Sequence, residues 1–347
     1  MDLPSDKDWL EDLSNLEGWL GAHLAGYGGA LTVERLSGGQ SNPTYKLITE
    51  RRSFVLRRKP SGVLLKGAHA IEREYRLLRS LEGTGVPVPR VYALCTDPTV
   101  IGSSFYVMEL IEGNIFWDAT FPSIPKHERA GYFDAMNGAL AALHQVDYAA
   151  AGLADYGPTE GYLPRQISKW TRQYRQDDAA GHIKQMEFLI PWLTEHCPAS
   201  SEIRIVHGDF RCDNMIFHPR MSSVLAVLDW ELSTLGDPLA DFAYHLMMYR
   251  LPPVGIAGLV GSDLQALNIP TEEEYAAAYC RRTARDGIPH LRFYLVFNLF
   301  RLAAIVHGIR GRVLRGNAAS NYNRQLTDAL PTIAEIAWEL ARLPGEA

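Results

Sequence analysis

The spacing of apolar residues divides the chain into a strand-rich first part and a helical second part. Near the N-terminus, apolar residues recur at steps of four, three and four, which places them on one face of a helix. After residue 30 the apolar runs become short and alternating, with polar turns between them, and this pattern is typical of an antiparallel meander. The expected strands are 31–36, 44–48, 54–58, 90–95 and 105–111.

A helical period returns at 69–81 and then dominates from about residue 114 onward. Two β-like runs, 203–206 and 224–228, interrupt it. The most apolar late stretch, 291–309, contains charged and polar residues and is too short to span a bilayer, so it predicts a buried helix and no membrane partner. We therefore expect an α+β fold, with an antiparallel five-stranded lobe over 1–111 and a mostly helical lobe over 112–347.

Composition narrows the functional classes. The chain has 347 residues, 47% of them hydrophobic and 21% charged, which is ordinary for a globular protein. The net charge of −6 gives no electrostatic basis for binding nucleic acid. Four cysteines lie far apart with no C-x-x-C spacing, and the acidic start of the chain shows no signal peptide. These features predict a cytoplasmic protein with reduced thiols.

The densest group of polar residues lies between two apolar runs, at 207–214. It contains His207, Asp209, Asp213 and Asn214, and a later apolar run ends at Asp229, fifteen residues after Asn214. If the apolar run after Asn214 and the run that ends at Asp229 form a hairpin, Asn214 and Asp229 meet at its end. Their oxygen atoms are the hard ligands that Mg²⁺ prefers when phosphates supply the rest.

Asp209 has a different expected role. A carboxylate beside a metal-bound phosphate can accept the proton of an attacking hydroxyl, so we predict that Asp209 is the catalytic base. The five-residue step from Asp209 to Asn214 is that of the protein-kinase catalytic loop. For Asp213, a simple turn or helix cap explains the residue equally well.

These motifs resemble the aminoglycoside phosphotransferase and choline kinase superfamily. The resemblance rests on His207-Gly208-Asp209 with Asn214, and on Leu-Asp-Trp-Glu at 228–231. Residues 36–45, 161–166 and 236–241 are similar to the kinase-like domain of acyl-CoA dehydrogenase family members 10 and 11. The resemblance covers nearly the whole chain. It implies a protein-kinase-like bilobal fold, ATP or GTP with Mg²⁺ as cofactors, and a small-molecule hydroxyl as the phosphate acceptor.

The first lobe is then expected to bind the nucleotide. Gly38 and Gly39 form a turn between two strands, where backbone N–H groups can approach phosphate oxygens, and Ser41 lies in the same loop. The form G-x-G-x-x-G is absent. The backbone from Glu109 to Ile111 is expected to bond the adenine edge, as in the linker between kinase lobes.

Alternation on the third strand places Val55 and Arg57 on one face. This matches the kinase strand Val-Ala-Ile-Lys, with Val55 over the adenine and Arg57 as the phosphate-binding cation. Arg58 and Lys59 follow directly, so the sequence leaves open which cation points inward. Glu74, on the flank of the next helix, is the expected partner of that cation.

The acceptor is predicted from charge. Arg165, Lys169 and Arg172 recur at steps of four and three, giving a basic stripe that would repel a polycationic aminoglycoside. The stripe predicts an anionic acceptor, and the subgroup resemblance implies a hydroxyacyl-CoA. A solvated basic face explains the stripe as well. An aminoglycoside or choline-type acceptor, a protein acceptor and a non-catalytic kinase-like binding protein remain as alternatives.

Overall fold

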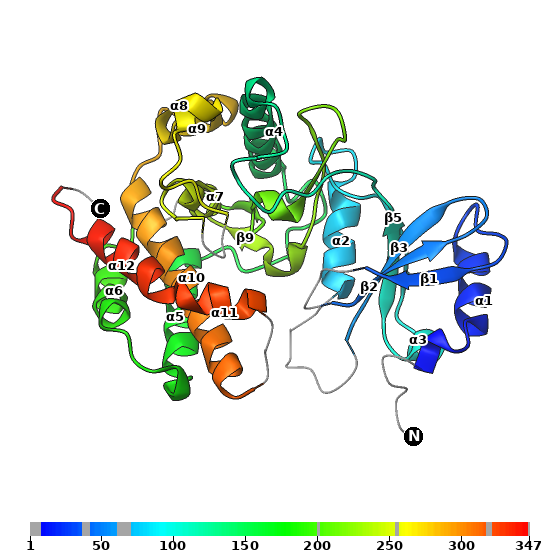
Figure 1. The fold of residues 1–347 in the computed structure, drawn as a ribbon. Coiled ribbons are helices and arrows are strands. Elements are labelled where there is room, and N and C mark those ends of the chain that lie inside the picture. The colour runs from blue at the N-terminus through cyan, green and yellow to red at the C-terminus, as the bar shows by residue number, and fades with distance from the viewer. Residues whose placement is uncertain are drawn as a thin grey trace.

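A five-stranded antiparallel sheet forms the first lobe of the computed structural model, which describes residues 8–36, 42–60, 71–199, 202–253, 257–316 and 321–345 (Figure 1). Its strand order is β1-β2-β3-β5-β4, so β5 lies between β3 and β4, and β4 is an edge strand. The strands are β1 (Thr32–Arg35), β2 (Thr44–Ile48), β3 (Ser53–Arg58), β4 (Val91–Cys95) and β5 (Phe105–Glu109).

The two faces of this sheet belong to different apolar clusters because neighbouring side chains of a strand point in opposite directions. Phe54 and Leu56 of β3 pack with Trp9, α1 (Ser14–His23) and α3 (Pro98–Ile101) on the outer face. Val55, on the inner face, joins the main cluster, which continues through α2 (Ile71–Leu81) into the helical lobe.

The second lobe is mostly helical, and α10 (Leu291–Leu314) runs through it against α5, α7 and α12 (Figure 1). By length and composition α10 could cross a membrane, but 83% of its apolar window is buried inside the protein. This confirms the predicted buried helix. The other helices are α4 (Lys126–Gln145), α5 (Tyr162–Arg175), α6 (Lys184–Glu195), α7 (Pro238–Leu246), α8 (Leu264–Leu267), α9 (Glu272–Arg282), α11 (Asn321–Asp328) and α12 (Leu330–Ala341).

Two pairs of short antiparallel strands lie within the helical lobe. β6 (Arg204–Val206) pairs with β9 (Thr234–Gly236), and β7 (Met215–Phe217) pairs with β8 (Val224–Val227). The amide of Val227 donates to the carbonyl of Pro87 at 2.9 Å, which links the hairpin of β7 and β8 to the connection that follows α2. These four strands carry the loops that hold the polar residues at 207–214 and Asp229.

The predicted α+β architecture is confirmed, and the five strands of the first lobe lie within two residues of their expected bounds. β5 ends at Glu109 instead of residue 111. The division of the chain at residue 111 stays a prediction, because the main apolar cluster includes residues of both lobes.

Candidate active site

The loop after β6 is held by a buried carboxylate from the start of α7. Asp241 accepts hydrogen bonds from the amides of His207 (2.7 Å) and Gly208 (2.8 Å). Its Oδ2 also lies 3.2 Å from Nε2 of His144 on α4. Burial alone would raise the pKa of Asp241, but the bond with His144 and the nearby imidazoles hold it below its ordinary value. The carboxylate is therefore charged and fixes the path of the loop.

His207 links this loop to the one that carries Asp229. Its Nδ1 accepts a hydrogen bond from the amide of Asp209 at 3.1 Å, so the proton of the neutral ring lies on Nε2. Nε2 then donates to the carbonyl of Leu228, the residue before Asp229, at 2.9 Å. The side chain is fully buried. His207 therefore sets the distance between Asp209 and Asp229.

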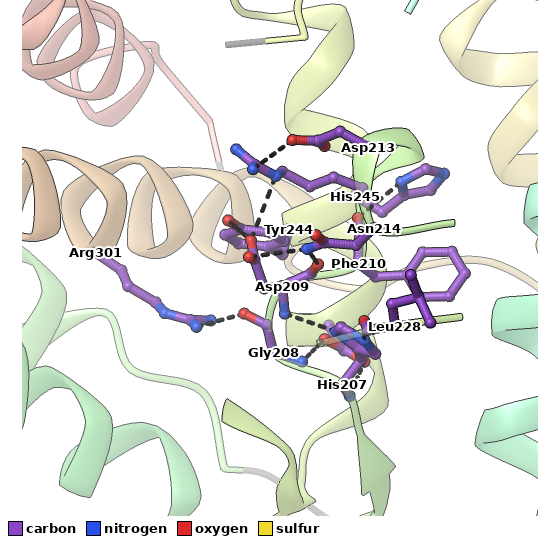
Figure 2. A network of polar contacts seen from close by, with 12 residues as sticks. His207, Gly208, Asp209, Phe210, Asp213, Asn214, Leu228, Tyr244, His245 and Arg301 are labelled. Atoms are coloured by element: carbon purple, nitrogen blue, oxygen red, sulfur yellow. Dashed lines mark hydrogen bonds and ion pairs between the residues drawn. The ribbon is translucent and has the colours of Figure 1, made fainter. Parts of the chain in front are cut away.

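The carboxylate of Asp209 has different partners on its two oxygens (Figure 2). Oδ1 accepts the hydroxyl of Tyr244 at 2.5 Å and lies 3.5 Å from Nε of Arg211. Oδ2 accepts the side-chain amide of Asn214 at 3.0 Å. Burial would raise the pKa of Asp209, but Arg211 and Tyr244 lower it further than burial raises it. Asp209 is thus ionised and held in one orientation.

The hairpin of β7 and β8 brings Asn214 and Asp229 to the same end, as the spacing predicts. Met215 pairs with Val227, and the amide of Leu228 donates to the carbonyl of Asn214 at 2.8 Å. The side-chain nitrogen of Asn214 is used by Asp209, so its oxygen remains for a cation. The Asp229 side chain is 36% exposed and its backbone is left-handed, with φ of 63°.

This donor set fits Mg²⁺. One carboxamide oxygen and one carboxylate oxygen are hard ligands, and such a site takes its remaining ligands from water and phosphate. Within the described ranges, no three His, Cys, Asp or Glu side chains gather to form a closed metal site. The pair Asn214 and Asp229 therefore suits an ion that arrives with a nucleotide.

Arg57 is the cation of β3 that faces this cleft. Its Nε lies 3.1 Å from Glu74 of α2, and its Nη2 lies 3.3 Å from Asp229. Burial would lower the pKa of Arg57, but the carboxylates of Glu74 and Asp229 raise it above its ordinary value. Burial in turn raises the pKa of Glu74 against the effect of Arg57. Val55 lies two residues earlier on the same face of the sheet.

Arg58 points to the opposite face of the sheet from Arg57. Its Nε donates to the hydroxyl of Ser103 at 3.0 Å, and its guanidinium lies 5.6 Å from the ring of Trp9. Arg58 is fully buried on the outer face of the sheet. Of the two arginines, only Arg57 contacts the candidate site.

The structure describes only some of the other residues that were predicted to contact the nucleotide. Glu109 ends β5, and its amide donates to the carbonyl of Arg90 at 2.8 Å, so this N–H is used within the protein. Ile111 follows two residues later and is partly buried. The predicted phosphate loop with Gly38, Gly39 and Ser41 lies outside the described residues.

The three predicted acceptor residues of α5 have different neighbours. Arg165 donates to the carbonyl of Pro158 at 3.1 Å, near the start of the helix. Arg172 lines a groove of about 630 Å³ between α5 and α6. Lys169 lies over the indole of Trp170, with 4.5 Å between its Nζ and the ring centre. The structure therefore does not gather them into one site.

Two side chains that the sequence analysis did not assign contact the loop at 207–214. Tyr244 of α7 donates to Asp209, and Arg301 of α10 donates to the carbonyl of Gly208 (Figure 2). A signal for Arg301 was present, because it is a charged residue within the most apolar stretch of the chain. Tyr244 has no comparable signal, since tyrosines are common in buried helices.

Gly208 lies between these contacts and has φ of +83°. A β-carbon at this position would lie 2.9 Å from the carbonyl oxygen of Leu232, in the turn after Asp229. Both the backbone angle and the lack of space therefore require glycine.

Comparison with known proteins places this geometry in a family. A profile described as the phosphotransferase enzyme family matches residues 32–294. The chain is 44% identical over 333 residues to acyl-CoA dehydrogenase family member 10 of Mus musculus, covering 95% of this chain and 31% of that protein. It is 39% identical over 339 residues to human family member 11, covering 95% of this chain and 43% of that protein. The chain thus spans less than half the length of these relatives.

Solved structures share the fold. A candidate aminoglycoside phosphotransferase from Ralstonia eutropha is 45% identical, with a TM-score of 0.88 over 95% of this chain and 98% of that one. A ternary complex of aminoglycoside phosphotransferase APH(4)-Ia with AMP-PNP and hygromycin B has a TM-score of 0.61 at 16% identity, covering 95% of this chain and all of the other. The second likeness shows the protein-kinase-like fold alone.

Proposed function

Because the chain belongs to the phosphotransferase enzyme family, we propose that it moves the γ-phosphate of ATP or GTP to the hydroxyl of a small molecule. The observation that carries this proposal is that four side chains come together at the loops after β6 and β8. Asp209 and Asn214 are joined by a hydrogen bond of 3.0 Å, and Asp229 and Arg57 by an ion pair of 3.3 Å. A base, two metal ligands and a phosphate-binding cation are what phosphoryl transfer requires.

In this proposal Asp209 positions the acceptor hydroxyl and takes its proton. The hydroxyl oxygen bonds to the γ-phosphorus as the bridging bond to the diphosphate breaks, and the proton moves to the Asp209 carboxylate. Arg57, which Glu74 holds in place, binds phosphate oxygens. Asn214 and Asp229 would hold Mg²⁺, which supplies charge neutralisation on the phosphates.

A hydroxyacyl-CoA is the acceptor class that we propose. Its support is the identity with acyl-CoA dehydrogenase family members 10 and 11, together with the cations Arg211 and Arg301 beside Asp209. An aminoglycoside, as in the hygromycin B complex of the neighbour, carries positive charge that these arginines would repel. An aminoglycoside or choline-like acceptor is therefore the alternative that the experiment tests.

The test measures ATP consumption with panels of hydroxyacyl-CoAs, aminoglycosides and choline-like alcohols. We expect turnover with a hydroxyacyl-CoA, and a loss of about 10²–10⁴ in kcat for Asp209→Asn with little change in nucleotide affinity. Asp178→Asn, which removes an exposed carboxylate, is the matched control. Equal turnover by Asp209→Asn would contradict its role as the base. Nucleotide binding without turnover of any acceptor would favour a non-catalytic kinase-like binding protein.

A reducing compartment such as the cytosol is the location that we propose. All four cysteines are free, and Cys95, Cys212 and Cys280 are buried. Burial raises the pKa of the Cys212 thiol to about 12, which makes it unreactive.

A further inference from the structure

Two cations lie against the same indole ring beside the catalytic loop. Nζ of Lys169 is 4.5 Å from the centre of the Trp170 ring, and Cζ of Arg301 is 5.4 Å from it. Trp170 and Arg301 are buried, whereas Lys169 is exposed. One member of the pair is therefore fixed in the protein and the other is open to a ligand.

The positive charge of this pair is not neutralised by a direct ion pair. Among the described residues, no carboxylate forms an ion pair within 4.0 Å of Lys169 or Arg301. Partial loss of hydration at its ammonium group and the repulsion of Arg301 both lower the pKa of Lys169, although its side chain stays accessible to solvent. Nε of Arg301 is buried and has no hydrogen-bond partner among the described residues. The aromatic ring stabilises each cation but leaves their mutual repulsion, which a bound anion would relieve.

The pair is close to Asp209 and on a defined side of it. Arg301 donates to the carbonyl of Gly208 and lies 5.0 Å from the centre of the Tyr244 ring, whose hydroxyl contacts Oδ1 of Asp209. Asn214 contacts Oδ2 of Asp209 instead. Figure 2 shows Arg301 and Asn214 on opposite sides of Asp209. Arg301 therefore lies on the side of Asp209 away from Asn214, one of the two proposed metal ligands.

Arg211, the other cation near Asp209, is already paired. Its Nη2 lies 2.7 Å from Asp213, and its Nε lies 3.5 Å from Asp209. Among the described residues, Lys169 and Arg301 are thus the cations on this side of Asp209 that form no direct ion pair.

We propose that Lys169 and Arg301 form a subsite for an oxyanion of the acceptor, a carboxylate or a phosphate, and that Arg301 determines specificity for acidic acceptors. The assignment to the acceptor rests on the proposed function, whereas binding of the oxyanion does not. An anionic group held here would leave the neighbouring hydroxyl beside Asp209, so the subsite selects acceptors in which a hydroxyl and an anion lie on one molecule.

Binding is tested without any turnover by titrating inorganic phosphate into the full chain labelled with fluorotryptophan. The chain has seven tryptophans, and Trp170→Phe identifies the resonance of Trp170. We expect phosphate to shift this resonance in a saturable way, with about tenfold weaker affinity in Lys169→Gln. Arg312→Gln removes one positive charge from an exposed position of α10 and should leave the titration unchanged.

Arg301→Lys keeps the buried charge but removes the planar set of guanidinium N–H donors, so we expect it to weaken phosphate binding as well. Equal phosphate affinity in wild type and Lys169→Gln, an exposed position whose change does not threaten folding, would overturn the subsite.

Kinetics distinguish the source of the oxyanion. With an acceptor that is turned over, Lys169→Gln should raise the KM for that acceptor about tenfold and leave the KM for ATP unchanged. A rise in the KM for ATP alone would assign the cations to the nucleotide and overturn the acceptor subsite. If no acceptor is turned over, the proposed function fails, while the phosphate titration still decides whether the subsite exists.

Discussion

Arg57 and Glu74 form a buried ion pair of 3.1 Å between the sheet and α2. The two residues are 8% and 5% exposed. Asp229 contacts the same guanidinium, so three charged groups from different parts of the chain are joined at the cleft. Two carboxylates thus fix the guanidinium of Arg57, the proposed phosphate-binding cation, and a fixed cation needs less ordering when it binds a ligand.

Glu74→Gln tests this arrangement. The variant leaves Arg57 buried with Asp229 as its remaining carboxylate partner, and we expect the free energy of unfolding to fall by about 1–3 kcal/mol. We also expect weaker ATP binding, because the guanidinium is no longer fixed. Denaturant unfolding and nucleotide titration measure the two effects. Glu72→Gln, at a partly exposed position of the same helix, is the control. Unchanged stability would show that Arg57 does not depend on Glu74.

Asp229→Ala separates a metal ligand from a residue that supports the fold. The change removes a proposed ligand of Mg²⁺ and frees Nη2 of Arg57. We therefore expect weaker ATP binding in the presence of Mg²⁺ and little loss without it. Calorimetric titration of ATP with and without the metal provides both affinities. An equal loss in the two titrations would contradict the metal role.

Asp241→Asn tests how the loop is held, and it carries a pH dependence. An amide cannot accept both backbone N–H bonds as a carboxylate does, so we expect a loss of about 3 kcal/mol at pH 7. The pKa of Asp241 is lower in the folded than in the unfolded chain, so its stabilisation is complete above the unfolded value of about 3.9 and is lost as the pH falls through the folded value. The difference between wild type and variant should therefore be constant from pH 7 to about 5 and shrink below pH 4. A difference that grows on acidification would contradict this account.

Arg73 joins α2 to the helical lobe. Its guanidinium donates to the carbonyls of Ser233 (2.9 Å) and Tyr156 (2.6 Å) and lies 3.8 Å from the Tyr156 ring. We expect Arg73→Gln to lower the free energy of unfolding by about 2 kcal/mol. Arg79→Gln, on the exposed side of the same helix, should change it by less than about 0.5 kcal/mol. Similar thermal unfolding of the two variants would show that the link does not contribute.

Sequence periodicity was sufficient for the long or strongly alternating elements. β2 has its expected bounds of Thr44–Ile48, and Val55 and Arg57 share the face that alternation assigns to them. The short strand β9 was not predicted, because three residues are too few to show a period and the strand is defined by its pairing with β6.

For the candidate site, motif spacing placed residues that lie on one hairpin or one strand. Asn214 and Asp229 meet because β7 and β8 are adjacent in the chain. The contacts of Arg301 and Tyr244 could not be predicted in this way, since they depend on how α10 and α7 pack against the loop. The basic stripe of α5 shows the same limit, because helical spacing does not say what lies opposite each side chain.

Gly208 has a consequence for which reactions this cleft can perform. The space between its α-carbon and the Leu232 carbonyl is too small for one methyl group, since a β-carbon would lie 2.9 Å from that oxygen. An added methyl group would push the loop of Asp209, the proposed proton acceptor, away from the turn after Asp229, the proposed metal ligand, and a displacement of about 1 Å can slow a reaction by about 10²-fold. Gly208 therefore fixes the distance between the loop that carries Asp209 and the turn that follows Asp229. We expect Gly208→Ala to fold and to bind nucleotide, but to hold the phosphorus too far from the acceptor oxygen for transfer.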